Sequence, residues 1–190
     1  MRSFAVLVVM FALQALEAGA APPPCAAAAH RQFDFWVGDW TVSRSDNGQH
    51  AGDNRIERVL DGCALHESWT GAKGYRGFSY NAYDASRGVW HQTWVDASGG
   101  LLLLEGAFKD GKMVLEGEQK QADGKTVLNR ITWTPLDGGK VRQRWESTTD
   151  GGKNWAVQFD GIYAKRAAGA SGGGGGGSGS GSPLSLRQDI

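Results

Sequence analysis

The sequence predicts an all-β protein, a closed antiparallel up-and-down β-barrel of about ten strands. Turn signals built on Asp-Gly or on paired glycines recur along most of the chain, about 13 residues apart. Between them, apolar and polar residues alternate, as they do in strands with one buried face. Long neighbouring strands would expose unpaired edges in an open sheet, so closure into a barrel is the expected arrangement.

The glycine turns place the strands, because glycine adopts a positive φ at no steric cost and so allows a tight hairpin. Clear turns lie at 110–112, 123–125, 137–140 and 150–153, and similar breaks lie at 61–62, 84–88 and 98–100. Strands are therefore expected at about 39–45, 54–61, 63–71, 75–83, 88–96, 101–109, 112–120, 125–134, 140–148 and 154–165. A short helical turn is expected only near residues 30–35.

The alternation also predicts which side chains point into the barrel. The expected inward sets are Cys63, Leu65, Glu67 and Trp69; Trp90, Gln92, Trp94 and Asp96; Val127, Asn129, Ile131 and Trp133; and Val141, Gln143 and Trp145. In the last strand, Trp155, Val157, Phe159 and Tyr163 are expected to share one face. The segment 101–109 begins with four leucines, which predicts either an exposed apolar patch or a covered outer surface.

The two ends of the chain differ from the barrel in composition. Residues 1–20 combine one early positive charge, a short apolar run and a small-residue site, as a secretory signal peptide does. Residues 21–29 form an N-terminal arm, 30–166 the barrel domain, and 167–190 a Gly/Ser-rich tail expected to be disordered. The expected location is the periplasm or the extracellular space, with no transmembrane segment in the mature chain.

The two cysteines, Cys25 and Cys63, are expected to form a disulfide in such an oxidising compartment. The bridge would fix the N-terminal arm to the start of a strand. Two unpaired thiols are the alternative. No metal site is expected, because the four histidines (His30, His50, His66 and His91) lack metal-ligand spacing.

The charge balance excludes one class of partner. The chain has 20 Lys and Arg residues against 20 Asp and Glu residues, so its formal net charge is +0. Nucleic-acid binding needs a basic excess, so no nucleic-acid partner is predicted. No cofactor is predicted either, since His66 and His91 fall on the outward face by parity and neither would reach a haem inside the barrel.

Gly38-Asp39-Trp40 resembles the G-x-W motif of lipocalins and the wider calycin barrels. The resemblance implies that Trp40 packs across the barrel base beside a late Arg or Lys, for which Lys165, Arg166 and Arg144 are candidates. A larger pattern comprises residues 33–40, 62–67, 83–84, 90–96, 132–135, 150–155 and 159–163. It resembles a bacterial family of secreted or periplasmic proteins that carry a domain of unknown function with a lipocalin-like barrel. That resemblance implies the fold and no substrate or catalytic residue.

Large indoles and several polar side chains on the inward faces predict an interior site for a small apolar or amphiphilic molecule. The expected ligand-binding residues are Trp69, Trp90, Gln92, Trp94, Asn129, Trp133, Gln143 and Trp145. The alternative is a filled barrel in which buried amides bond only to each other or to trapped water. Such a protein would act through interactions in the cell envelope, with its tail as a tether.

Glu67 is the one candidate catalytic residue. A carboxyl on an inward barrel face beside Trp69 would be desolvated, and its pKa would rise unless a cation paired with it. It could then serve as the general acid or base of a cofactor-free isomerase, cyclase or hydratase. Arg58 or Arg130 could instead pair with Glu67 and make it a structural ion pair.

Overall fold

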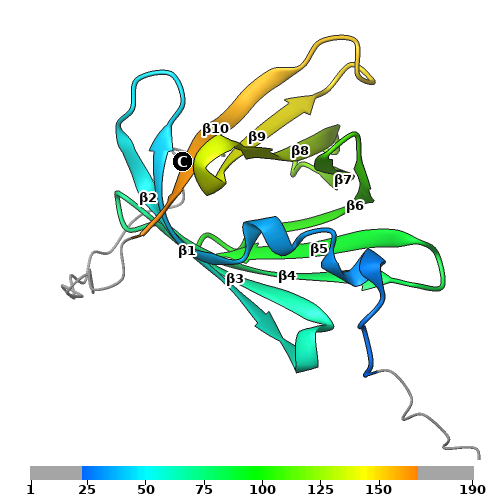
Figure 1. Ribbon diagram of the computed structural model, residues 1–190. Coiled ribbons are helices and arrows are strands. Elements are labelled where there is room, and N and C mark those ends of the chain that lie inside the picture. Colours follow the sequence, from blue (N-terminus) through cyan, green and yellow to red (C-terminus); the bar gives the residue numbers. More distant parts are fainter. Residues whose placement is uncertain (1–22, 167–190) are drawn as a thin grey trace, which may run out of the picture.

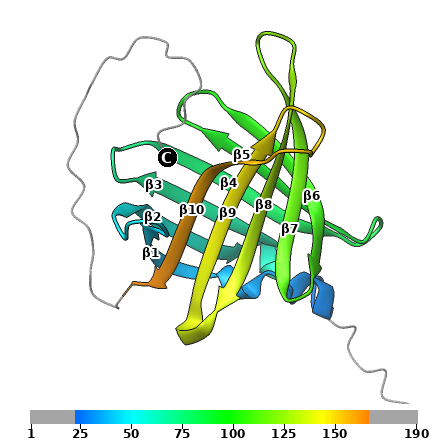
Figure 2. The same cartoon turned by 90° about the horizontal axis from the view of Figure 1, so that it is seen from above.

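The chain folds into one closed barrel of ten antiparallel strands, as a computed structural model of residues 23–166 shows (Figures 1 and 2). The strands are β1 (Gly38–Arg44), β2 (His50–Val59), β3 (Ala64–Gly71), β4 (Arg76–Asp84), β5 (Val89–Asp96), β6 (Leu101–Lys109), β7 (Lys112–Lys120), β8 (Thr126–Leu136), β9 (Lys140–Thr148) and β10 (Ala156–Lys165). Each strand pairs with its neighbours in sequence, and β1 pairs with β10 to close the sheet. The predicted fold class is confirmed.

Two expected features lie outside the described residues. They are the signal peptide at 1–20 and the Gly/Ser-rich tail at 167–190.

Strand bounds follow the glycine turns closely, with one exception. β2 begins at His50, four residues before its expected start, and its first half holds Gly52 and Asp53. Those residues have low strand propensity. They are strand residues here because they pair with β1 on one side and β3 on the other.

One end of the barrel is closed by the N-terminal segment. The short 3₁₀ turns η1 (Ala28–Arg31) and η2 (Asp34–Trp36) cross it (Figure 1). Phe33 and Trp36 are fully buried there, and Phe33 stacks on Trp36 with ring centroids 4.9 Å apart. Phe33 also meets Trp133 edge to face at 5.1 Å. An aromatic plug therefore fills the closed end.

Trp40 occupies the position that the G-x-W resemblance implies. Its indole Nε1 donates to the Trp36 carbonyl at 2.8 Å. The Lys165 ammonium lies 3.9 Å from the centre of the Trp40 ring, in cation–π contact. Of the three basic candidates, Lys165 is the partner, and it also donates to the Val37 carbonyl.

Cys25 and Cys63 form the expected disulfide, with Cα atoms 5.1 Å apart across 38 residues of sequence. Arg31 supports the same junction, because its Nη2 donates to the carbonyls of Cys25 at 2.6 Å and Gly62 at 2.8 Å. The disulfide fixes the N-terminal arm to the β2–β3 connection and so holds the plug in place.

Removing the disulfide is expected to lower the free energy of unfolding by about 4 kcal/mol, the entropy of closing a loop of this length. Urea denaturation of the Cys25→Ser/Cys63→Ser double variant measures the loss. The wild-type protein under reducing conditions is the matched control and should lose a similar amount. A loss below about 1 kcal/mol in both would show that the arm contributes little to stability.

The expected inward faces are confirmed for β3, β5, β8 and β9, except that Cys63 lies in the turn before β3, and the expectation for the last strand is wrong in part. Phe159 and Tyr163 are buried, whereas Val157 is 48% exposed. The register with β9 shifts between Val157 and Phe159, so a β-bulge moves the residues before it to the outer face. Trp155 lies outside the barrel too, under the Arg130 guanidinium at 3.9 Å.

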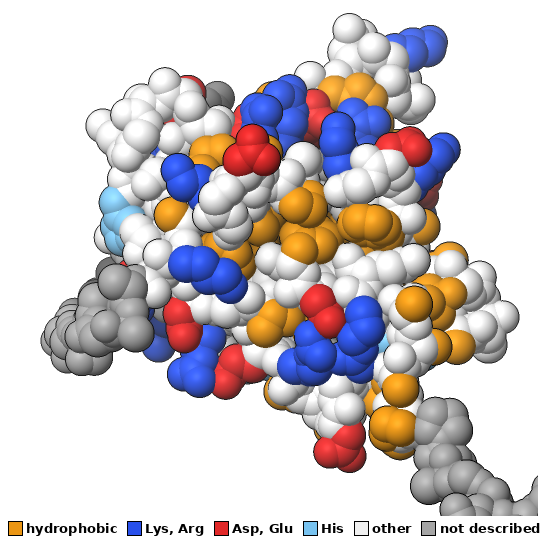
Figure 3. Space-filling view, in the orientation of Figure 1, with side chains coloured by type: hydrophobic (Ala, Val, Ile, Leu, Met, Phe, Trp, Pro, Cys, Tyr) orange, Lys and Arg blue, Asp and Glu red, His pale blue; other side chains and the backbone are white. Residues whose placement is uncertain are grey.

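The four leucines of β6 divide between the two faces. Leu102 and Leu104 are buried, while Leu101 and Leu103 are about half exposed. The exposed pair lies beside Val95, Phe78 and Tyr80, which are also exposed, on the outer face of neighbouring strands. An exposed apolar patch therefore lies across β4–β6. Figure 3 shows one face of the molecule in the orientation of Figure 1. On that face, hydrophobic side chains gather in the middle and charged side chains surround them.

Candidate functional site

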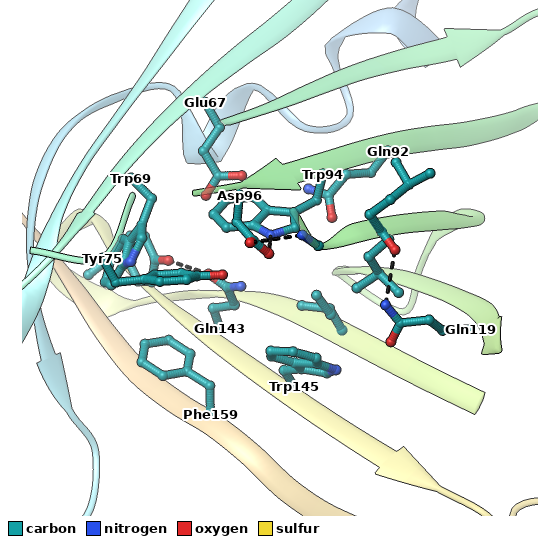
Figure 4. Close-up of a pocket in the computed structure, with 15 residues that line it drawn as sticks. Glu67, Trp69, Tyr75, Gln92, Trp94, Asp96, Gln119, Gln143, Trp145 and Phe159 are labelled. Carbon is teal, nitrogen blue, oxygen red and sulfur yellow. Dashed lines mark hydrogen bonds between the residues drawn. The ribbon is translucent and has the colours of Figure 1, made fainter. Parts of the chain in front are cut away.

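A cavity of about 70 Å³ lies inside the barrel, away from the aromatic plug. Its rim lies at the ends of the strands of the β3–β4, β5–β6 and β7–β8 hairpins and is lined by Tyr75, Asp96, Gly100, Leu101 and Gln119. In an up-and-down barrel these connections all lie at the end opposite the one that the N-terminal segment closes. The deeper lining residues are Glu67, Trp69, Gln92, Trp94, Leu102, Ile131, Gln143, Trp145, Phe159 and Tyr163 (Figure 4).

Glu67 is held in the wall of this cavity by β3. The strand alternation turns Leu65, Glu67 and Trp69 inward, and Glu67 is only 4% exposed. Asn54 of β2 donates from Nδ2 to Oε1 of Glu67 at 2.7 Å. Ser79 of β4 donates from Oγ to Oε2 at 2.6 Å. Both carboxyl oxygens therefore accept a hydrogen bond from a neighbouring strand.

A chain of amides continues this arrangement across β4 and β5. Asn81 Nδ2 donates to Ser79 Oγ at 2.9 Å, and Gln92 Nε2 donates to Asn81 Oδ1 at 2.8 Å. Each of these donors points along the chain toward Glu67. Because Ser79 accepts from Asn81, its own proton is free to bond to the carboxyl. The network therefore directs its dipoles toward a negative charge on Glu67.

The pKa of Glu67 is raised to about 7 by its burial, which hydrogen bonds from Ser79 and Asn54 only partly offset. The expected alternative, an ion pair with Arg58 or Arg130, is wrong. Arg58 binds Asp34 at 2.6 Å, and Arg130 binds Glu146 at 3.2 Å on the outer face. Glu67 is thus a buried carboxyl without an ion-pair partner among residues 23–166, and it titrates near neutral pH.

Tyr163 closes the network on the other side of Glu67. Its hydroxyl donates to Oε1 of Gln143, and Asn54 Nδ2 approaches that hydroxyl at 3.4 Å. Burial and the nearby Glu67 charge raise the pKa of Tyr163 well above its ordinary value. Tyr163 therefore remains a neutral donor, and it leaves Glu67 as the titrating group at this depth.

Aromatic rings form the rest of the wall. Trp69 meets Phe159 edge to face at 6.0 Å. Trp94 lies flat over Gly77, where a Cβ atom would fall 2.1 Å from the indole, so only glycine leaves room for the ring. Figure 4 shows Glu67 and Asp96 on one side of the cavity, with the rings of Trp145 and Phe159 across from them.

Asp96 lies at the rim, two strands from Glu67 and one inward layer nearer to the opening. Its carboxylate accepts from Ser98 Oγ at 2.5 Å, from the Gly100 amide at 3.0 Å and from Trp94 Nε1 at 3.3 Å. Partial burial disfavours its charge, but the hydrogen bonds outweigh burial and hold the pKa of Asp96 below its ordinary value. Asp96 is therefore charged at neutral pH.

The structure brings many of the expected site residues together. Glu67, Trp69, Gln92, Trp94, Gln143 and Trp145 all line the cavity. Trp90, Asn129 and Trp133 do not. Trp90 and Trp133 point inward as expected, but at the depth that Phe33 of the plug occupies, and they pack on its ring. Asn129 is buried on the inward face of β8 but is separated from the cavity, and its Oδ1 accepts from Trp145 Nε1 at 2.9 Å.

The groups that bond to Glu67 are not among the predicted site residues. Gly77, Ser79 and Asn81 alternate along β4, so parity alone would have placed small and polar side chains inside next to β3. Asn54 was harder to assign because β2 begins earlier than its composition suggests. Tyr163 lies on the buried face, as the alternation predicts, but no sequence signal links it to Gln143.

No group of three or more His, Cys, Asp or Glu residues that could hold a metal ion occurs within residues 23–166. The same part of the chain contains no helix long and apolar enough to cross a membrane. No protein-family model matches the sequence, and a search of the curated proteins finds no relative.

Proposed function

We propose that this protein is a lipocalin-like barrel that binds a small apolar or amphiphilic molecule in its interior. The observation that carries the proposal is the cavity itself, with aromatic rings on several sides and polar groups at two depths. Most ligand sites combine an apolar lining with a few placed polar groups in this way. A filled barrel has less support, because the space reaches a buried carboxyl rather than ending at packed side chains.

The cavity size favours a slender ligand. An engineered apolar cavity of about 150 Å³ accommodates benzene. The space here is about 70 Å³ but opens at the rim, so a ligand with one ring or a short chain would extend from Glu67 in the depth to Asp96 and Gln119 at the rim. Aromatic contacts with Trp94 and Trp145 would supply most of the binding energy.

The compartment is part of the same proposal. A Cys25–Cys63 disulfide is typical of proteins that work in an oxidising environment. Together with the expected signal peptide, it supports export to the periplasm or beyond. Membership of the secreted or periplasmic family that the sequence resembles would agree with this location.

Trp145→Ala is expected to weaken binding of 2-phenylethanol, a neutral probe with one ring, by at least about tenfold, since it removes one wall of the cavity. Calorimetric titration measures the change. Trp155→Ala is the matched control, because Trp155 stacks on Arg130 outside the barrel, and it should bind as the wild type does. Equal affinity of all three proteins for the probe would contradict the proposal.

The raised pKa of Glu67 favours one further candidate, a cofactor-free enzyme that moves a proton on a neutral ligand. Native mass spectrometry of protein from its own cells would identify the bound molecule. If Glu67 acts as a general base, the wild type should exchange a carbon-bound hydrogen of that molecule with deuterated water. Glu67→Gln should retain binding and lose the exchange. Equal exchange by both proteins would exclude this role.

A further inference from the structure

The cavity carries negative charge without a positive partner. Two carboxyl groups line it, Glu67 in its depth and Asp96 at its rim. Among the described residues, no Lys, Arg or His shares the lining with them. Buried charges in proteins are normally paired, so a carboxyl placed in a ligand site without a cation is unusual.

The hydrogen bonds around Glu67 are arranged for the charged form. Asn54 and Ser79 each donate to one of its oxygens, and Asn81 and Gln92 align behind Ser79. A neutral carboxyl group donates from its O–H oxygen, so it would need an acceptor at that oxygen rather than a second donor. Burial opposes the charge that these donors favour, and one cation in the cavity would remove that opposition.

Aromatic faces provide the second half of a cation site. The rings of Trp69, Trp94, Trp145 and Phe159 surround the space next to the carboxyl groups. Indole faces attract ammonium and guanidinium groups through the ring quadrupole, most strongly when water is excluded. The same rings offer no oxygen ligands to a metal ion and would be left uncovered by one.

We propose that the ligand is an organic cation, a protonated amine carried on an aryl or short alkyl group. Its ammonium group lies against the Glu67 carboxylate, and its apolar part lies along the indoles toward the rim. This inference rests on the proposed binding function and names the chemical class of the ligand.

The inference predicts that binding of the ligand is coupled to the release of a proton from Glu67. Glu67 has a raised pKa when the site is empty, so an ammonium ligand must displace its proton near and below neutral pH. Asn54 and Ser79 bond directly to Glu67. The groups that bond in turn to these two or to each other are Asn81, Gln92, Gln143 and Tyr163. Tyr163 alone among them titrates, and its pKa is raised. Asp96 is already charged, so the proton released on binding is that of Glu67.

The test uses three probes with one ring and different head groups: 2-phenylethylamine, 2-phenylethanol and 3-phenylpropionate. Calorimetric titration of the full folded chain gives each affinity from pH 5.5 to 8.5. The amine should bind at least about tenfold more tightly than the alcohol at pH 8. Its affinity should rise by up to about tenfold per pH unit below pH 7 and level off above it. Buffers of different ionisation heat should reveal about one proton released at pH 6.

Glu67→Gln should weaken amine binding at least about tenfold, abolish the pH dependence and leave the alcohol within about threefold. Glu118→Gln, on the exposed outer face of β7, is the matched control. The pH dependence and proton release of the wild type test the inference even if Glu67→Gln does not fold.

Three outcomes would overturn the inference while leaving the binding function intact. They are an alcohol that binds as tightly as the amine, a carboxylate that binds most tightly, and an amine affinity that is flat or falls with rising pH. If none of the three probes binds and no ligand accompanies the protein from its cells, the binding function itself fails.

Discussion

Trp133→Ala is expected to lower the free energy of unfolding by about 3–5 kcal/mol, the largest loss for a single substitution that we anticipate. Trp133 is fully buried and touches Phe33 at 5.1 Å and Trp36 at 5.3 Å, measured between ring centroids. No group within residues 23–166 accepts a hydrogen bond from its Nε1, so the loss is one of packing. The plug would then face an empty space where the indole lay.

Urea denaturation followed by circular dichroism measures this loss. Trp133→Phe keeps a ring in place and removes an unpaired N–H, so it should cost much less than the alanine variant. Leu103→Ala, on the exposed outer face of β6, should stay within about 0.5 kcal/mol of the wild type. A small loss for Trp133→Ala would mean that the N-terminal segment does not depend on the barrel interior for its position.

The second large effect is the contribution of Glu67 to the pH dependence of the free energy of unfolding. The pKa of Glu67 is about 7 in the folded protein against an ordinary value of 4.5. The folded state therefore holds this proton more tightly than the unfolded state does. The contribution of this proton to the free energy of unfolding is fully present below pH 4.5 and is lost as the pH rises through 7. At 1.36 kcal/mol per pKa unit, the loss between pH 4 and pH 8 is about 3 kcal/mol.

Glu67→Gln isolates this contribution from those of the other carboxyl groups, such as Asp96 and Asp160, whose lowered pKa values act in the opposite direction at acid pH. The difference in unfolding free energy between wild type and Glu67→Gln should change by about 3 kcal/mol across pH 4–8. With Glu118→Gln in place of Glu67→Gln, the difference should stay flat. A flat difference for both variants would place the pKa of Glu67 near its ordinary value.

The barrel could be predicted because the hairpin turns and the alternation of buried and exposed side chains are both set by short stretches of sequence. The turns at 110–112 and 123–125 are fixed by glycines with positive φ, Gly111 and Gly124. The strand of β8 shows its buried face by simple alternation of Asn129, Ile131 and Trp133 with exposed or half-exposed neighbours. β10 departed from the prediction where a bulge inserts Gln158, because a bulge changes parity without a distinct sequence signal.

The candidate site was predicted only in part. The alternation of side chains shows which residues point into the barrel, but it does not show how far along the barrel axis each of them lies. Trp94 and Trp90 share an inward face four residues apart, yet Trp94 lines the cavity and Trp90 packs on the plug. The difference comes from Phe33, a residue about 60 positions away in sequence, which enters one end of the barrel. No pattern within β5 could have shown which of the two indoles would border open space.

The sequence by itself determined the strand order and the inward faces of β3, β5, β8 and β9, and it predicted that Cys25 pairs with Cys63, because hairpin turns, side-chain alternation and cysteine number are local or countable features. The tertiary structure decided where the barrel is filled and where it is hollow. It also decided that Glu67 bonds to Asn54 and Ser79 rather than to an arginine. Those outcomes depend on residues brought together from separate strands, whose shared electrostatic environment no single segment contains.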